Sequence, residues 1–227
     1  MNKVGNATYN NIEDVPGVVP VFPLPRALLL PRAHMPLNIF EPRYIAMIDA
    51  ALRTDRVIGL VQPDFTIPDL DLAGRPPLCK VGCLGRITAF QESGDGRYLL
   101  TLSGVCRFDV KGELEERAPF RRAAVDVSRF ASDLVPGVGE DAVDREHLLK
   151  TLRTYLSAND LEVDWEGVND ATTETLVNAL SLMSPYDAME KQALLEAEDL
   201  KTRADTLIAL AEVELARDAA GPSATLQ

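Results

Sequence analysis

The hydrophobic pattern of this 227-residue chain changes its period near residue 136. Upstream, short apolar runs alternate with turns and prolines, which is typical of β-strands. Downstream of Pro136-Gly137-Val138-Gly139, apolar residues recur every three or four positions, as they do along one face of a helix. We therefore predict an α+β protein. Its expected segments are a flexible N-terminus (1–15), a β-barrel (16–130), a linker (131–140), an all-helical subdomain (141–218) and a loose tail (219–227).

Several short strands are expected in the first 130 residues. Val57 to Val61 is a continuous apolar run that suits a central strand. Prolines interrupt the runs at Val18 to Phe22 and Leu28 to Leu30, and proline favours the edge of a sheet because it cannot donate a ladder hydrogen bond. The Asp95-Gly96 step predicts a tight hairpin, because Asp-Gly suits the turn that joins two antiparallel strands. The chain before and after this step is expected to form those strands, over 80–92 and 97–110. Ala123 to Val127 alternates in polarity and predicts one more strand.

Helices are expected at one place in the first half and at four places in the second. Pro42 can take the first helical position, where a missing N–H costs nothing, and Glu41 suits the positive end of the helix dipole. The C-terminal part contains four apolar stripes at helical spacing, around Leu152, Leu180, Leu194 and Leu207. Asp187 with Glu190 resembles a capping box, and Asp199 is a candidate N-cap. These amphipathic helices either pack on one another or close one end of the barrel.

The charge of the chain is distributed unevenly. Residues 1–130 hold 16 basic and 15 acidic residues, whereas residues 131–227 hold 7 and 20, a net charge of −13. Such a segment repels polyanions, so nucleic acid and anionic membranes are poor partners. The sequence contains neither an apolar stretch of membrane-spanning length nor a signal-peptide pattern. Three cysteines suit a reducing compartment, so we expect a cytoplasmic protein.

Motifs for catalysis, cofactors and metals are missing from the sequence. It has neither the Gly-x4-Gly-Lys-Ser/Thr phosphate loop nor the Gly-x-Ser-x-Gly nucleophile elbow. Cys79 and Cys83 are a poor zinc site, because four-coordinate zinc needs four donors. Pairs such as Glu115-Glu116 are expected to be solvated, and Arg121-Arg122 suits a mixed, solvated strand better than a phosphate site. We therefore expect no catalytic, cofactor or metal site.

One proline-rich segment carries apolar residues without a regular period. Residues 64–72 read Asp-Phe-Thr-Ile-Pro-Asp-Leu-Asp-Leu. Apolar residues in a long loop either tuck onto the barrel or remain free for a partner. The sequence is compatible with both alternatives. If the segment binds a partner, the candidate peptide-binding residues are Phe65, Ile67 and Leu70.

Four blocks of the first half carry a family likeness. They are Val21-Phe22-Pro23-Leu24-Pro25, Pro36-Leu37-Asn38-Ile39-Phe40-Glu41-Pro42-Arg43-Tyr44, Lys80-Val81-Gly82-Cys83-Leu84-Gly85-Arg86-Ile87 and Gly104-Val105-Cys106-Arg107-Phe108. In order and spacing they resemble the N-terminal domain of Lon proteases. The motif residues within these blocks are Asn38, Phe40, Glu41, Pro42, Arg43, Tyr44, Gly82, Arg86, Gly104 and Arg107.

The resemblance implies a PUA-like β-barrel with one inserted helix, followed by a helical bundle. In Lon proteases this domain recognises unfolded or tagged polypeptides and helps to assemble the hexamer. The ATPase and the Ser-Lys peptidase of Lon are missing from this sequence, so we expect a stand-alone, non-catalytic module. It would bind unfolded or extended polypeptide, as an adaptor or holdase and without a cofactor.

Other functions remain open alongside polypeptide binding. The chain could regulate or help to assemble a full-length Lon protease, it could associate with itself, or it could be an unrecognised hydrolase. The likeness to PUA domains also suggests RNA binding as a function, but the nearly neutral barrel lacks the basic stripe that RNA binding requires. The motif residues also have structural interpretations. Gly82 and Gly104 suit close backbone approach, and Arg86 and Arg107 are expected to pair with acids such as Glu41.

Overall fold

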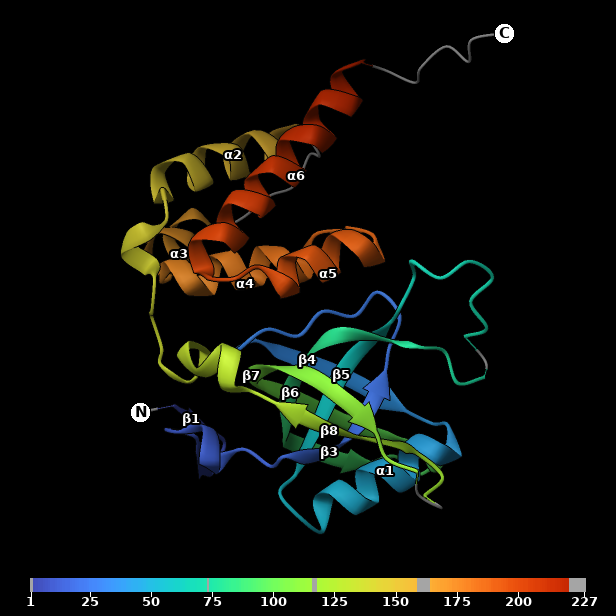
Figure 1. Ribbon diagram of the computed structural model, residues 1–227. Helices are drawn as coiled ribbons and strands as arrows, with labels where there is room; N and C mark the ends of the chain where they lie inside the picture. The colour runs from blue at the N-terminus through green and yellow to red at the C-terminus, as the bar shows by residue number, and fades with distance from the viewer. Residues whose placement is uncertain (1, 73, 116–117, 159–163, 221–227) are drawn as a thin grey trace, which may run out of the picture.

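The computed structural model describes residues 2–72, 74–115, 118–158 and 164–220, and it has two layers, a β-barrel and a helical region above it (Figure 1). The barrel strands are β3 (Val18–Pro23), β5 (Val57–Pro63), β6 (Leu78–Glu92), β7 (Tyr98–Glu113) and β8 (Arg121–Asp126). They pair in the order β7-β6-β5-β3-β8, and β8 pairs with β7 again to close the ring. The β3–β5 pair is parallel and the others are antiparallel, so the barrel is mixed.

One strand and one helix are added between β3 and β5. Strand β4 (His34–Ile39) pairs with the far part of β7, outside the closed ring. Helix α1 (Pro42–Leu52) follows with Glu41 as N-cap and Pro42 in the first turn, as predicted. The predicted α+β fold, a barrel with an inserted helix followed by a helical region, is confirmed. Strand β4 was not predicted from the sequence, because Pro36 interrupts its alternation.

The prediction that prolines keep the first strand at a sheet edge is wrong. Strand β3 lies between β5 and β8. Its pairing with β8 covers Val18 to Val21, whereas its pairing with β5 covers Val21 to Pro23. Pro20 and Pro23 therefore each have a partner strand on one side only, which is how a central strand accommodates them. The run Leu28 to Leu30 forms no strand at all, and its side chains are buried.

The N-terminal residues, for which we expected flexibility, fold onto the barrel. β1 (Lys3–Val4) and β2 (Ala7–Thr8) form a small hairpin, and the 3-10 helix η1 (Ile12–Asp14) follows. Val4 and Tyr9 are buried in a cluster with barrel residues such as Val57 and Val105. Two isolated apolar residues give no periodic signal, so this packing could not be read from the sequence.

Short 3-10 helices join the barrel to five α-helices. The elements are η2 (Ser128–Leu134), η3 (Glu140–Ala142), α2 (Arg145–Ala158), α3 (Trp165–Asp170), α4 (Thr173–Met183), α5 (Ala188–Glu196) and α6 (Leu200–Ala220). The four predicted helices are α2, α4, α5 and α6, whereas α3 was not predicted. Asp187 and Glu190 form the predicted capping box at α5, and Asp199 accepts the Thr202 N–H at 2.7 Å. The expected tail over 219–227 lies largely outside the described residues.

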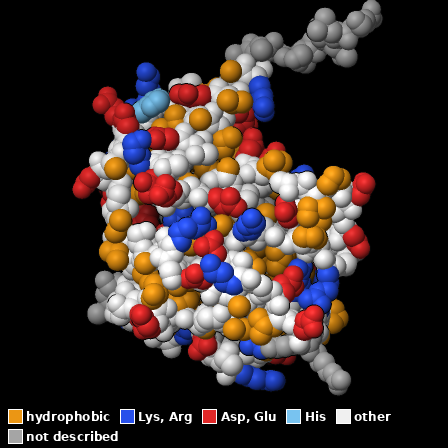
Figure 2. All heavy atoms as spheres, viewed as in Figure 1, with side chains coloured by type: hydrophobic (Ala, Val, Ile, Leu, Met, Phe, Trp, Pro, Cys, Tyr) orange, Lys and Arg blue, Asp and Glu red, His pale blue; other side chains and the backbone are white. Residues whose placement is uncertain are grey.

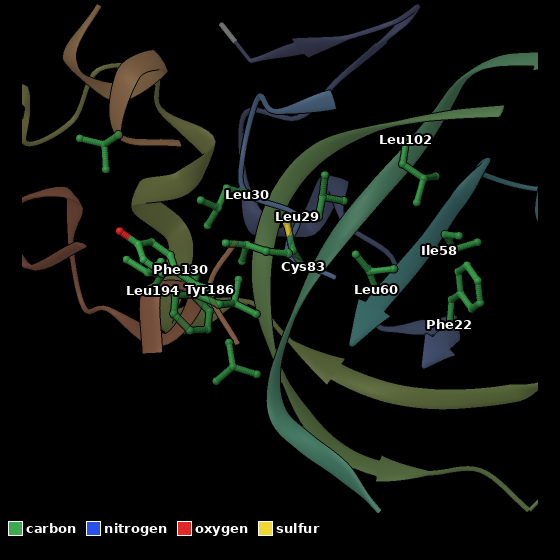
Figure 3. Packing of buried hydrophobic residues seen from close by; sticks show 14 of the residues in the cluster. Phe22, Leu29, Leu30, Ile58, Leu60, Cys83, Leu102, Phe130, Tyr186 and Leu194 are labelled. Carbon is green, nitrogen blue, oxygen red and sulfur yellow. The ribbon is translucent and has the colours of Figure 1, made fainter. Parts of the chain in front are cut away.

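Among the helices that the structure describes, none is long and apolar enough to cross a membrane. Their apolar faces are used inside the protein instead. One hydrophobic cluster runs from the barrel strands into the helical region (Figure 3). Leu60 and Cys83 belong to its barrel side, and Phe130, Tyr186 and Leu194 to its helical side. The helices therefore pack on the barrel as well as on one another.

A buried ion pair fastens the two layers. Arg107 on β7 is 2% exposed, and its Nε and Nη2 each donate to the Asp133 carboxylate at 2.8 Å. Its Nη1 donates to the carbonyl oxygens of Leu195 and Ala197 beyond the barrel. The expectation that Glu41 pairs with such arginines is wrong, because Glu41 accepts from Arg43, its neighbour at the start of α1.

Candidate functional site

A long loop leaves the barrel between β5 and β6 and projects beside α5 (Figure 1). At its base, the Asp64 N–H donates to the Pro77 carbonyl at 2.9 Å. The Asp64 carboxylate in turn accepts the backbone N–H and the hydroxyl of Thr66, at 3.1 and 2.6 Å. These bonds fix the direction of the first loop residues, including Phe65.

A hollow of about 600 Å³ lies between this part of the loop, the start of β6 and α5. We call it the α5 groove, and its lining includes Phe65, Thr66, Val81, Met189, Gln192 and Ala193. Phe65 is half-buried, whereas Met189 is 59% exposed. Figure 2 shows hydrophobic side chains gathered where α5 and the loop meet. The α5 groove thus offers apolar surface from two separate elements.

Side-chain hydrogen bonds hold α5 in place against the barrel. Gln62 at the end of β5 donates its Nε2 to the Ala188 carbonyl at 2.9 Å. Gln192 donates its Nε2 to the Val81 carbonyl on β6 at 3.1 Å. Because both glutamines bridge the barrel and α5, the width of the α5 groove is set by the folded barrel rather than by the loop alone.

The polar groups in the α5 groove are of both signs and are not arranged for covalent chemistry. Lys80, Arg129, Asp64 and Glu196 also line it, and Arg129 pairs with Asp109 at 2.8 Å. Burial raises the pKa of the Cys79 thiol to about 11, so this cysteine is protonated near neutral pH and is a poor nucleophile. The α5 groove is therefore suited to binding a neutral or mixed-charge chain.

The structure separates the three predicted peptide-binding residues. Phe65 lines the α5 groove, whereas Ile67 and Leu70 are not part of its lining. Ile67 is exposed on the loop and Leu70 is half-buried. Met189 was not predicted: α5 is less amphipathic than the stripe around Leu194 suggested, so its sequence does not indicate which face is free. The binding roles of Phe65, Ile67 and Leu70 stay predictions.

The family motif residues lie outside the α5 groove lining. Tyr44 packs against Phe22, with ring centroids 4.4 Å apart, and the Arg43 guanidinium lies over the Tyr44 ring at 4.7 Å. Asn38 and Phe40 are exposed. The remaining motif residues Gly82, Arg86, Gly104 and Arg107 are on β6 and β7. Arg86 donates to the Asp55 carbonyl at 2.5 Å and to Asn6 Oδ1 at 2.8 Å, joining the N-terminal hairpin to the barrel.

A second hollow, of about 170 Å³, lies on the other side of the loop. Leu72, Arg75 and Arg121 contribute to it. Arg121 donates to both oxygens of Glu113, and its hydrogen bonds lower the pKa of that carboxyl. Arg121 also donates to the Pro76 carbonyl at 2.8 Å. Arg121 therefore serves to anchor the loop.

A serine–histidine contact bears on the hydrolase alternative. The His34 Nδ1 lies 2.8 Å from the Ser103 Oγ, which is also 2.7 Å from the Thr88 Oγ1. Ser103 is only 3% exposed. Because its hydroxyl is enclosed by β-strand neighbours, this contact has the character of a structural hydrogen bond. Over the described ranges, no group of three or more His, Cys, Asp or Glu side chains is placed to hold a metal ion.

The fold is that of the N-terminal domains of Lon proteases. The Lon N-terminal domain protein from Xanthomonas campestris matches with a TM-score of 0.59 and 23% identity, over 85% of this chain and 97% of that chain. The N-terminal domain of the Mycobacterium avium complex Lon protease matches with a TM-score of 0.63 and 20% identity, over 86% and 98%. The family model for the ATP-dependent protease La (LON) substrate-binding domain matches residues 18–212. The chain therefore belongs to the Lon substrate-binding domain family.

Curated relatives are whole Lon proteases. Lon protease 2 of Myxococcus xanthus is 31% identical over 206 residues, which is 88% of this chain and 24% of the relative. The Lon protease of Anaeromyxobacter dehalogenans is 28% identical over 216 residues, or 91% and 24%. The chain thus spans about a quarter of the length of the relatives it matches. This N-terminal quarter does not include the ATPase and protease parts of Lon.

Proposed function

We propose that the chain is a non-catalytic, cytoplasmic polypeptide-binding module that works as an adaptor or holdase for unfolded proteins. Its binding site is the α5 groove, which receives an extended segment between Phe65 and Met189. The observation that carries the proposal is an accessible hollow of about 600 Å³ with an exposed methionine on its α5 wall. Membership of a substrate-binding domain family supports the same function.

The affinity expected from this geometry is weak. Burying one large apolar side chain contributes about 1.5–3 kcal/mol, and the α5 groove offers room for a few such side chains. Ordering a flexible segment offsets about 2–5 kcal/mol of the gain. Methionine suits this role because its flexible, polarisable side chain can pack against many different partners. Weak and sequence-tolerant binding is what a module for unfolded chains requires.

Aspartate substitutions in the α5 groove are expected to weaken binding of an unfolded protein at least tenfold. Phe65→Asp and Met189→Asp each place a charge on the apolar surface that the bound segment must cover, and burying an unpaired charge is unfavourable. Titration calorimetry with a reduced, carboxymethylated protein measures the effect. The matched control is Val213→Asp, which changes an exposed apolar residue on α6 outside the α5 groove. Unchanged affinity in both groove variants would remove the α5 groove from the proposal.

A second candidate function is docking on a full-length Lon protease. It is favoured by exposed apolar residues on β7 and directly after β4, outside the α5 groove. Phe40, which follows β4, is 63% exposed, and Leu99 on β7 is also exposed opposite Asn38. Co-elution of this chain with full-length Lon tests that function independently of unfolded substrate.

A further inference from the structure

The helical region contains a hollow of its own. It measures about 270 Å³ and is enclosed by α2, α4 and α6, with Val168 contributed by α3. We call it the helical hollow, and its apolar lining includes Leu148, Leu152, Leu176, Leu180, Leu207 and Ile208. An opening lined by aliphatic side chains favours an apolar occupant, because water gains few hydrogen bonds there.

One end of the helical hollow is polar and has glutamate side chains nearby. Tyr155 and Tyr186 line it there, and Glu214 lies one helical turn beyond the lining residue Ala211 on α6. The Glu214 Oε2 is buried and accepts no hydrogen bond. Burial raises the pKa of Tyr186 to about 12, and the nearby Glu214 and Glu190 carboxylates add to the shift. Leaving a buried acceptor without a donor costs free energy, so an occupant whose N–H group donates to it binds more favourably.

The surrounding charge favours a cationic occupant. Residues 131–227, which include the whole helical region, carry a net charge of −13. Such a field attracts cations and repels anionic chains. Apolar lining, an unpaired carboxylate oxygen and a negative field therefore describe one kind of ligand, an apolar group next to a cation.

We propose that the helical hollow binds polypeptide segments in which a large apolar side chain is adjacent to lysine or arginine. The apolar side chain enters between α2, α4 and α6, and the cationic group donates to Glu214. This inference rests on the proposed function and deepens it: the α5 groove accepts mixed sequences, whereas the helical hollow selects basic, apolar segments.

The test uses two capped decapeptides, one alternating Leu with Lys and one alternating Leu with Glu. Trp165 is the only tryptophan of the chain and lies on α3, which contributes Val168 to the helical hollow. Its fluorescence therefore reports binding without a label. The Leu/Lys peptide is expected to bind saturably and at least tenfold more tightly than the Leu/Glu peptide.

Two variants separate the apolar and the charged contribution. Ala211→Leu fills the helical hollow and is expected to abolish binding of the Leu/Lys peptide. Glu214→Gln keeps the shape, removes the charge and is expected to reduce the affinity about tenfold. Glu212→Gln is the matched control, because Glu212 is exposed on the same helix and faces His147 at 3.3 Å. Circular dichroism checks that each variant is folded.

Several outcomes would overturn the inference. Equal affinity for both peptides would contradict the proposed selectivity. Unchanged affinity of Glu214→Gln for the Leu/Lys peptide would contradict the role of the carboxylate. Concentration-dependent self-association that Ala211→Leu abolishes would assign the helical hollow to a second copy of this chain. Failure of the inference stays distinguishable from failure of the proposed function. If the proposed function is wrong, Phe65→Asp should still bind the Leu/Lys peptide. If the inference is wrong, Glu214→Gln should not change the affinity for the Leu/Lys peptide, and unfolded protein should still bind the α5 groove.

Discussion

Replacing Arg107 by methionine is expected to lower the free energy of unfolding by about 3–5 kcal/mol. The substitution leaves the Asp133 carboxylate buried without its cation, and it removes the donor to the Leu195 and Ala197 carbonyls. Removing one partner of a buried pair costs far more than the pair itself contributes, because the remaining charge has lost its water and its partner. Urea denaturation measures the change.

The chain offers a closely matched control for this prediction. Arg107 and Arg129 both lie over the Phe130 ring, each with its guanidinium carbon 4.5 Å from the centroid. The Arg129 side chain is 58% exposed and pairs with Asp109 at the surface. Surface pairs contribute about 0–1 kcal/mol, so Arg129→Met should change stability little. Similar losses in the two variants would contradict a special role for the buried pair.

A second buried arginine extends this contact between the layers. Arg203 on α6 donates its Nε to the Leu194 carbonyl at 2.9 Å and its Nη1 to the Asn178 side chain at 3.3 Å. Asn178 in turn donates to the Pro31 carbonyl at 3.1 Å. Burial lowers the pKa of Arg203 to about 10, so it remains charged near neutral pH. The helical region is thereby fixed to the barrel by polar contacts as well as by the apolar core.

Gly104→Ala is expected to destabilise the protein by about 3 kcal/mol. Strand β7 passes the turn after Leu30 so closely that a Cβ at residue 104 would overlap the Leu30 carbonyl group. Backbone hydrogen bonds hold this approach: Gly104 donates to the Ala33 carbonyl and accepts from the Arg32 N–H, both at 2.9 Å. Because the obstacle is backbone, a rotamer change cannot relieve it.

The control for this prediction lies on the same strand. Gly112 is in β7 as well, and a Cβ there would meet no atom within 4 Å. Gly112→Ala should therefore be neutral or slightly stabilising, because alanine reduces the conformational freedom of the unfolded chain. Thermal unfolding of both variants measures the difference in stability. Comparable losses of stability in the two variants would contradict the steric role assigned to Gly104.

Much of the fold was predictable because its periodic signals are strong. The β6–β7 hairpin follows from the Asp95-Gly96 step, and the capping box at Asp187 marks the start of α5. Strand β4 was missed because its proline breaks the alternation. The partner of Arg107 could not be predicted, since Asp133 lies 26 residues away in a segment taken for a linker.

The candidate site was predicted only in part for a related reason. An apolar residue in a proline-rich loop, such as Phe65, is visible in the sequence. The position of Met189 opposite Phe65 could not be predicted, because it depends on how Gln62 and Gln192 hold α5 against the barrel. The unpaired oxygen of Glu214 likewise depends on how α6 packs.

Photo-crosslinking from Phe65 tests the polypeptide-binding function most directly. Phe65 is replaced by benzoylphenylalanine, and the same replacement at Phe90, an exposed phenylalanine on β6 outside the α5 groove, is the control. With a reduced, carboxymethylated protein as substrate, we expect crosslinks from position 65 that excess unlabelled substrate competes away. Few crosslinks are expected from position 90. Crosslinking that is equal at both positions, or absent at position 65, would contradict binding of unfolded polypeptide in the α5 groove.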